Sequence, residues 1–120
     1  MYDQKAANTK RWLKTRRSQR IDLEVSVAVS RPPREGPQFY ESTKTLVVSA
    51  HGALMVLKGM VAPKQKLLLQ NTGSGKQEEC RVVSVNHELT GPPTVAVEFT
   101  RRAPSFWHLA FPPADWTVDT

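Results

Sequence analysis

The sequence lacks the paired cysteines needed for internal disulfide bonds and the long apolar runs that span a membrane. Cys80 is the only cysteine among 120 residues, so no internal disulfide is possible. No run approaches the roughly 18 apolar residues of a membrane span, and the charged N-terminus lacks the apolar stretch of a signal peptide. Hydrophobic residues make up 39% and charged residues 23%, as in ordinary globular domains. We therefore expect one cytoplasmic domain with a modest core.

Patterns that support catalysis or metal binding are also missing. The three histidines are far apart in the sequence, and none has a partner at a spacing such as HxxxH: His51, His87 and His108. Cys80 has no companion motif for nucleophilic catalysis. The run from Gly73 to Lys76 lacks the first glycine of a phosphate-binding loop, and Gln77 replaces its hydroxyl residue, so we interpret the run as a hairpin turn. We predict that the protein is not an enzyme and has no metal or cofactor.

The net charge, in contrast, is concentrated at one end. The first twenty residues hold seven basic side chains against Asp3 alone, which accounts for the whole net charge of +6. The basic residues are Lys5, Lys10, Arg11, Lys14, Arg16, Arg17 and Arg20. Residues 3–14 can form a short helix with Asp3 as its N-cap. A basic arm attached to a neutral domain indicates an anionic partner.

Alternating apolar residues predict β-strands after the arm. Residues 21–29 alternate almost perfectly, which indicates a half-buried strand. Further β-rich runs cover 39–49, 53–57, 66–70, 78–87 and 95–99, and Gly52 can supply the positive φ of a tight turn. Six short strands with such turns predict an all-β fold, a small antiparallel barrel or sandwich. We divide the chain into a basic arm (1–20), a barrel (21–100) and an aromatic C-terminal segment (101–120) that packs on the barrel.

Two short patterns are candidates for ligand binding. Arg16 and Arg20 have the spacing RxxxR immediately before the first strand, with Arg17 between them. A guanidinium group can bond phosphate, or the O6/N7 edge of guanine, with two parallel hydrogen bonds, while its face stacks on a base. Further along, residues 49–52 have the form SxxG where one predicted strand ends and the next begins.

In this order, RxxxR and SxxG resemble the PilZ-domain family, whose signatures are RxxxR and [D/N]xSxxG. Residues 95–99, Val-Ala-Val-Glu-Phe, are similar to the family's hydrophobic-Gly-hydrophobic-Glu-Phe strand. The resemblance covers residues 12–111 and implies a six-stranded antiparallel β-barrel that binds cyclic di-GMP, a bacterial second messenger. By position, Arg16 and Arg20 would hold the phosphates and a guanine, and Arg17 would add a phosphate contact. Ser49 and Gly52 would line the floor beneath the nucleotide.

The second signature is incomplete in this chain, because Val47 stands at its [D/N] position. Valine cannot accept a hydrogen bond from guanine. A hydrogen bond to a charged group is worth about 1.5–3 kcal/mol, so its loss predicts binding weaker by roughly ten- to a hundredfold. The sequence alone predicts that Val47→Asp would tighten binding.

Three functions are compatible with these features. The favoured one is a non-enzymatic cyclic di-GMP receptor in bacterial signalling, whose arm closes on the barrel and changes the surface offered to a protein partner. The second is a divergent PilZ barrel that does not bind the nucleotide and acts as a protein-interaction module. The third is a basic-armed barrel that binds RNA or DNA phosphates.

Overall fold

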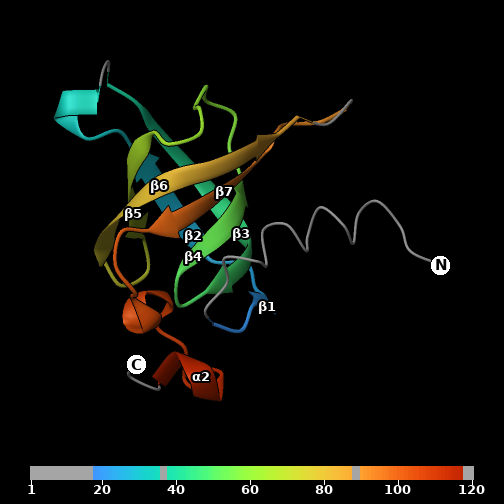
Figure 1. Ribbon diagram of the computed structural model, residues 1–120, viewed down its shortest axis with the longest axis vertical. Coiled ribbons are helices and arrows are strands. Elements are labelled where there is room, and N and C mark those ends of the chain that lie inside the picture. Colours follow the sequence, from blue (N-terminus) through green and yellow to red (C-terminus); the bar gives the residue numbers. More distant parts are fainter. Residues whose placement is uncertain (1–17, 36–37, 88–89, 118–120) are drawn as a thin grey trace.

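Seven antiparallel strands form one sheet that closes on itself (Figure 1). The computed structural model describes residues 18–35, 38–87 and 90–117, so the predicted helix over 3–14, Arg16 and Arg17 lie outside the described residues. The strands are β1 (Ile21–Asp22), β2 (Ser26–Ser30), β3 (Tyr40–Ser49), β4 (Gly52–Val56), β5 (Lys66–Asn71), β6 (Gln77–Asn86) and β7 (Thr94–Phe99).

The strand order explains how the barrel closes. The sheet runs β1-β3-β2-β5-β6-β7-β4, and an additional pairing of β3 with β4 joins its two ends. Strands β2 to β7 thus make a closed six-stranded antiparallel barrel, which confirms the fold class predicted from the sequence, and β1 is an extra short strand beside β3. Closure removes the exposed sheet edges that would otherwise invite pairing with other chains.

The strand predicted over 21–29 is divided into β1 and β2 by a break at residues 23–25, although both parts pair with β3. Thr45 on β3 explains the break. Its hydroxyl donates to the Leu23 carbonyl at 2.7 Å and accepts the Val25 N–H at 2.9 Å. Thr45 is fully buried. Its hydroxyl therefore takes the place of the ladder partners that the Leu23 carbonyl and the Val25 N–H would have in a regular sheet, so these backbone groups stay hydrogen-bonded.

The barrel interior is filled by the inward-facing side chains of the strands. Val27 and Val29 are completely buried, and Ile21, Leu23 and Val25 pack against the same core, so the prediction that this alternating face is buried is confirmed. Cys80 also lies in the core, and burial raises the pKa of its thiol to about 12. Complete burial of a Val or Leu side chain is worth about 1.5–3 kcal/mol, which makes this interior the main source of stability.

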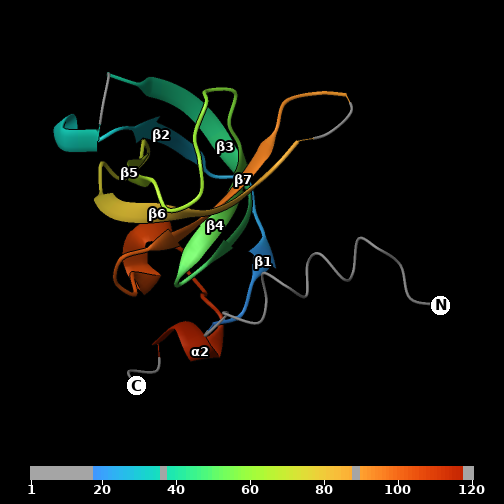
Figure 2. The same cartoon turned by 45° about the horizontal axis from the view of Figure 1, so that its top comes forward.

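The chain after β7 closes one end of the barrel (Figure 2). It contains two short helices, η2 (Pro104–Trp107) and α2 (Ala114–Thr117); a further short helix, η1 (Pro33–Glu35), lies between β2 and β3. Phe106 packs edge-on against Phe99 and Trp107, with ring centroids 5.2 and 4.8 Å apart. The buried amide of Asn71 donates to the Phe106 carbonyl at 2.8 Å, so the β5–β6 hairpin and η2 are joined by a desolvated hydrogen bond.

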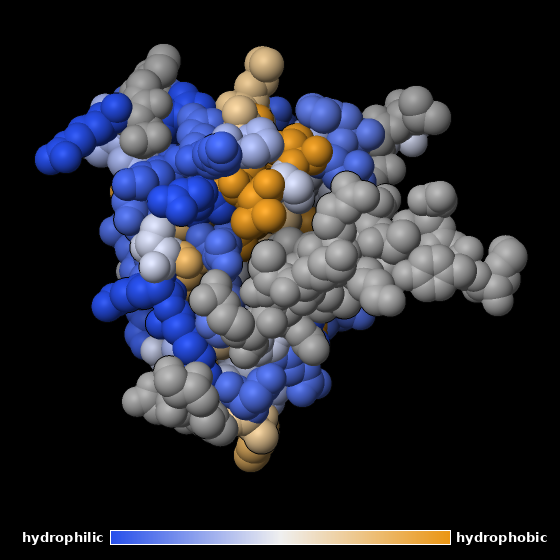
Figure 3. All heavy atoms as spheres, viewed as in Figure 1, coloured by the Kyte–Doolittle hydropathy of each residue, from blue (hydrophilic) through white to orange (hydrophobic). Residues whose placement is uncertain are grey.

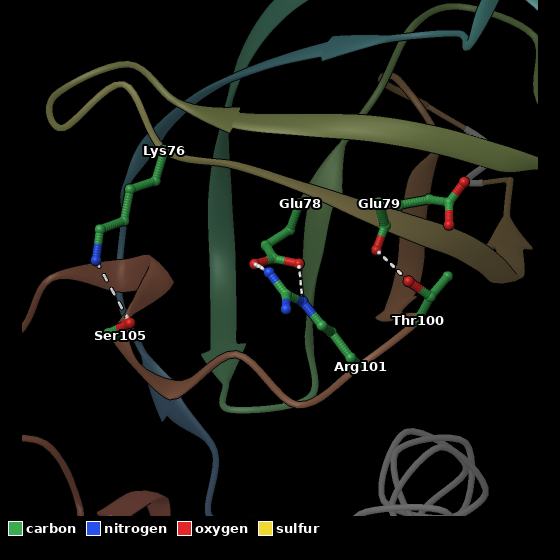
Figure 4. A network of polar contacts seen from close by, with 6 residues as sticks. All are labelled: Lys76, Glu78, Glu79, Thr100, Arg101 and Ser105. Atoms are coloured by element: carbon green, nitrogen blue, oxygen red, sulfur yellow. Dashed lines mark hydrogen bonds and ion pairs between the residues drawn. The ribbon is translucent and has the colours of Figure 1, made fainter.

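Exposed contacts support the same junction (Figure 4). Arg101 donates to both carboxylate oxygens of Glu78, at 3.3 and 3.2 Å, and this hydrogen bonding raises the pKa of the Arg101 guanidinium. The Thr100 hydroxyl donates to the Glu79 carbonyl at 3.3 Å. Because solvent screens exposed ion pairs, we assign the junction's stability chiefly to the buried aromatic packing.

The visible surface in Figure 3 is mostly hydrophilic, with one small apolar area near its upper middle. The exposed large hydrophobic residues of the described ranges lie on β3, on β6 and in loops: Tyr40, Leu46, Met60, Val83 and Phe111. Scattered residues of this kind are normal on a soluble surface. Within the described ranges, no helix has both the length and the apolar character needed to cross a membrane.

Candidate functional site

Ser18 joins the RxxxR segment to the SxxG turn. The Ala50 N–H donates to the Ser18 hydroxyl at 3.1 Å, and the same oxygen lies 3.0 Å from Nδ1 of His51. Ser18 is only 2% exposed, and Ala50 is fully buried. Ser18 stands between positions 16 and 20 of the sequence, so residues 18–20, the described part of the RxxxR segment, lie at the same end of the barrel as the SxxG turn.

The pairing of β1 with β3 defines which residues share the outer face of this region. Ile21 pairs with Val48, and Asp22 pairs with Val47. Val48 lies in the core and Ile21 packs against it, so the next residues, Asp22 and Val47, face away from the core. The same register, continued toward the N-terminus, sets Arg20 opposite Ser49. Arg20 is half-buried, and its Nε and Nη1 atoms are shielded from solvent.

Ser49 already uses its polar atoms within the protein. Its hydroxyl accepts the His51 N–H at 3.1 Å, and its carbonyl accepts the indole N–H of Trp107 at 2.7 Å. At 3% exposure, Ser49 shapes the turn and supports the surface above it. A direct contact of Ser49 with a ligand stays a prediction.

Gly52 is required by a close approach between two strands. A Cβ at this position would lie 2.0 Å from the Val97 carbonyl oxygen on β7. Its φ is not in the left-handed region, so the sequence-based reason for this glycine, a positive φ in a tight turn, is wrong. Its absent side chain lets β4 pack directly against β7; whether it also lines a ligand floor stays a prediction.

The C-terminal helix α2 contacts the residues that lead into β1, which the β3–β4 turn also contacts. Trp116 is fully buried, and its indole N–H donates to the Gln19 carbonyl at 2.7 Å. The Gln19 N–H donates to the Asp115 carboxylate at 2.8 Å. Arg102 in turn donates to the backbone carbonyls of Asp115 and Trp116. The residues leading into β1 therefore lie between the β3–β4 turn and α2, and both elements hold them by hydrogen bonds.

Sequence reasoning did not identify several residues of this region. The spacing of the histidines gives His51 no role, whereas in the structure its half-buried ring contacts Ser18. Its position inside the SxxG run was the only available signal. Ser18 and Asp22 carry no motif, and their roles depend on the long-range pairing of β1 with β3. Within the described ranges, no group of three or more His, Cys, Asp or Glu side chains could hold a metal ion.

Comparison with known proteins agrees with the fold. No protein-family model matches the chain, and no curated protein sequence does. Among solved structures, the chain is similar to the Bacillus subtilis inhibitor of motility, MotI/DgrA, with a TM-score of 0.57 and 18% identity over 73% of this chain. It spans 44% of the length of that protein. A likeness at this identity concerns the fold alone, and the fold is PilZ-like.

Proposed function

We propose that this protein is a non-enzymatic receptor for cyclic di-GMP in the bacterial cytoplasm. The nucleotide binds at the end of the barrel where the basic arm meets the β3–β4 turn. One observation carries the proposal: the hydrogen bond from the Ala50 N–H to Ser18 brings the RxxxR segment to the SxxG turn. A PilZ-like barrel and the concentration of charge in the arm also support it.

The chemistry of the arm suits this ligand. Cyclic di-GMP carries two phosphates and two flat purines, so it offers both anionic oxygens and stacking surfaces. Arg16 and Arg20 bind the phosphates and one guanine, and Arg17 adds a phosphate contact. Ser49 and Gly52 form the floor. Because the barrel itself is neutral, most of the electrostatic attraction comes from the arm.

Binding is coupled to the C-terminal segment through residues 18 and 19. Gln19 exchanges hydrogen bonds with Trp116 and Asp115 on α2, next to the Ser18 anchor. A nucleotide that moves or tightens the arm therefore alters the docking of α2. We propose that a protein partner recognises this changed surface, since a ligand shifts a conformational equilibrium by its different affinity for the two states.

Calorimetric titration of the purified protein with cyclic di-GMP tests the proposal. Arg16→Ala should abolish binding or weaken it at least tenfold, because it removes a charge-assisted phosphate contact. Lys10→Ala removes the same charge from the arm outside RxxxR, so it is the matched control and should change affinity little. GTP and a short oligonucleotide serve as competing ligands.

Other outcomes would point to the other two functions. Equal losses from both substitutions, with a steep salt dependence and tight oligonucleotide binding, would indicate a nucleic-acid binder. If no nucleotide gives a heat of binding, the favoured function would be the divergent barrel that acts as a protein-interaction module.

A further inference from the structure

We infer that the carboxylate of Asp22 replaces the acidic side chain that is missing at position 47, and that this carboxylate selects guanine over adenine. The inference rests on the proposed function, because it concerns the same ligand. Its basis is the register of the sheet, in which Asp22 on β1 is the direct partner of Val47 on β3. The sequence gives no hint of this pairing, since 24 residues separate the two positions in the chain.

The geometry lets one position replace the other. Directly opposed residues in an antiparallel pair have Cβ atoms about 4.5–5.5 Å apart, and their side chains lie on the same face. That face is the outer one, because the neighbouring pair, Ile21 and Val48, is turned toward the core. Asp22 is exposed, whereas Val47 is half-buried. A carboxylate extending from Asp22 can therefore reach the space above Val47.

Asp22 and Arg20 together match the two polar edges of guanine. Guanine presents O6 and N7 as acceptors, and N1–H and the N2 amino group as donors. Arg20 lies two residues before Asp22, which corresponds to about 6–7 Å along a strand. The arginine donates to O6 and N7, and the carboxylate accepts from N1–H and N2–H. Adenine has a lone pair at N1, so the same carboxylate would repel it.

The sign of a substitution effect separates this role from general electrostatics. Cyclic di-GMP is an anion, so removing any nearby carboxylate should tighten its binding if only long-range charge matters. A loss of affinity after removal of Asp22 therefore requires a direct contact. Glu24 is the matched control because it is another exposed carboxylate close by, 3.7 Å from Lys44.

The experiment measures the affinities of cyclic di-GMP and cyclic di-AMP by calorimetry. Asp22→Ala should lower the cyclic di-GMP affinity by about tenfold or more, the loss expected for a charge-assisted hydrogen bond, and leave cyclic di-AMP binding no weaker. Glu24→Ala should leave the cyclic di-GMP affinity unchanged or slightly raised. Combining Asp22→Ala with Val47→Asp moves the carboxylate across the ladder and should recover most of the affinity and the preference for guanine.

Two results would overturn the inference in different ways. If wild-type protein binds cyclic di-GMP and Arg16→Ala abolishes this, but Asp22→Ala binds as well as wild type, the role of Asp22 is refuted and the proposed function stands. If wild-type protein does not bind cyclic di-GMP at all, both are refuted. Because Asp22 is exposed, the Asp22→Ala variant should keep the melting temperature of the wild type, which excludes unfolding as the cause of any loss.

Discussion

Removing the hydroxyl of Ser18 should destabilise the protein measurably. The Ala50 N–H donates to this hydroxyl, and Ala50 is fully buried, so Ser18→Ala leaves a desolvated donor without its acceptor. Such a loss costs about 1–3 kcal/mol. The contact with His51 adds less, because that ring is only half-buried. For a domain with about 5–15 kcal/mol of total stability, the loss is a substantial fraction.

Urea unfolding followed by tryptophan fluorescence measures this effect. With a slope of about 2 kcal/mol per molar urea, a loss of 2 kcal/mol lowers the midpoint by about 1 M. Ser105→Ala is the control: Ser105 is exposed and its hydroxyl makes a long, exposed contact of 3.4 Å with the Lys76 ammonium, so stability should change by less than about 0.5 kcal/mol. An unchanged midpoint for Ser18→Ala would refute the claim that this hydroxyl fastens the arm to the turn.

Further substitutions and treatments have defined outcomes. Gly52→Ala should cost about 1–3 kcal/mol or more in thermal unfolding, because its Cβ would collide with a strand backbone; Gly73→Ala, whose Cβ would make an ordinary 3.4 Å contact, should be nearly neutral. Cys80 should resist thiol reagents at about pH 8 until the protein is denatured, since burial raises the pKa of the thiol to about 12. The free energy of unfolding should not be affected by the ionisation of Cys80 below pH 9.0, the ordinary pKa of a thiol. It should decline as the pH rises toward 12, because in that range the thiol ionises in the unfolded protein but not in the folded one. Val47→Asp alone should not tighten cyclic di-GMP binding in calorimetry, because it sets a second carboxylate opposite Asp22; a clear gain would contradict the role given to Asp22.

The strands were predictable because residues 21–29 alternate and the other runs are rich in β-forming apolar residues between turn residues. The run predicted over 95–99 corresponds to β7, Thr94–Phe99, and the run over 66–70 to β5, Lys66–Asn71. The break between β1 and β2 was not predictable in this way. It depends on the hydroxyl of Thr45, a residue on another strand, while the local alternation continues unbroken.

The candidate site was predictable only in outline. The sequence shows that RxxxR precedes the first strand and that SxxG follows a strand, but not which residues between them touch. The partnership of Asp22 with Val47 depends on register, and a slip of one residue would turn every side chain of β1 to the other face. Ile21 and Val48 both pack against the core and so fix the register, whereas local alternation indicates only which face is buried and not which residues of the two strands pair.

In the C-terminal segment, amino-acid composition likewise predicted only part of the structure. Its high aromatic content predicts burial, and Phe106, Trp107 and Trp116 are indeed buried, whereas Phe111 is 94% exposed. Composition does not identify partners either. The contact of Trp116 with Gln19 joins the last helix to the beginning of the described chain, and only the folded arrangement reveals it.

Titration of isotope-labelled protein with cyclic di-GMP, followed by the NMR shifts of backbone amides, tests the central claim most directly. We predict that the largest changes occur at Ala50, His51, Asp22 and Val47, around the junction of β1 with the β3–β4 turn. The loop between β4 and β5, at Lys58 to Gln65, should change little. Shifts centred on that loop, or none at a saturating concentration of nucleotide, would contradict binding at this end of the barrel.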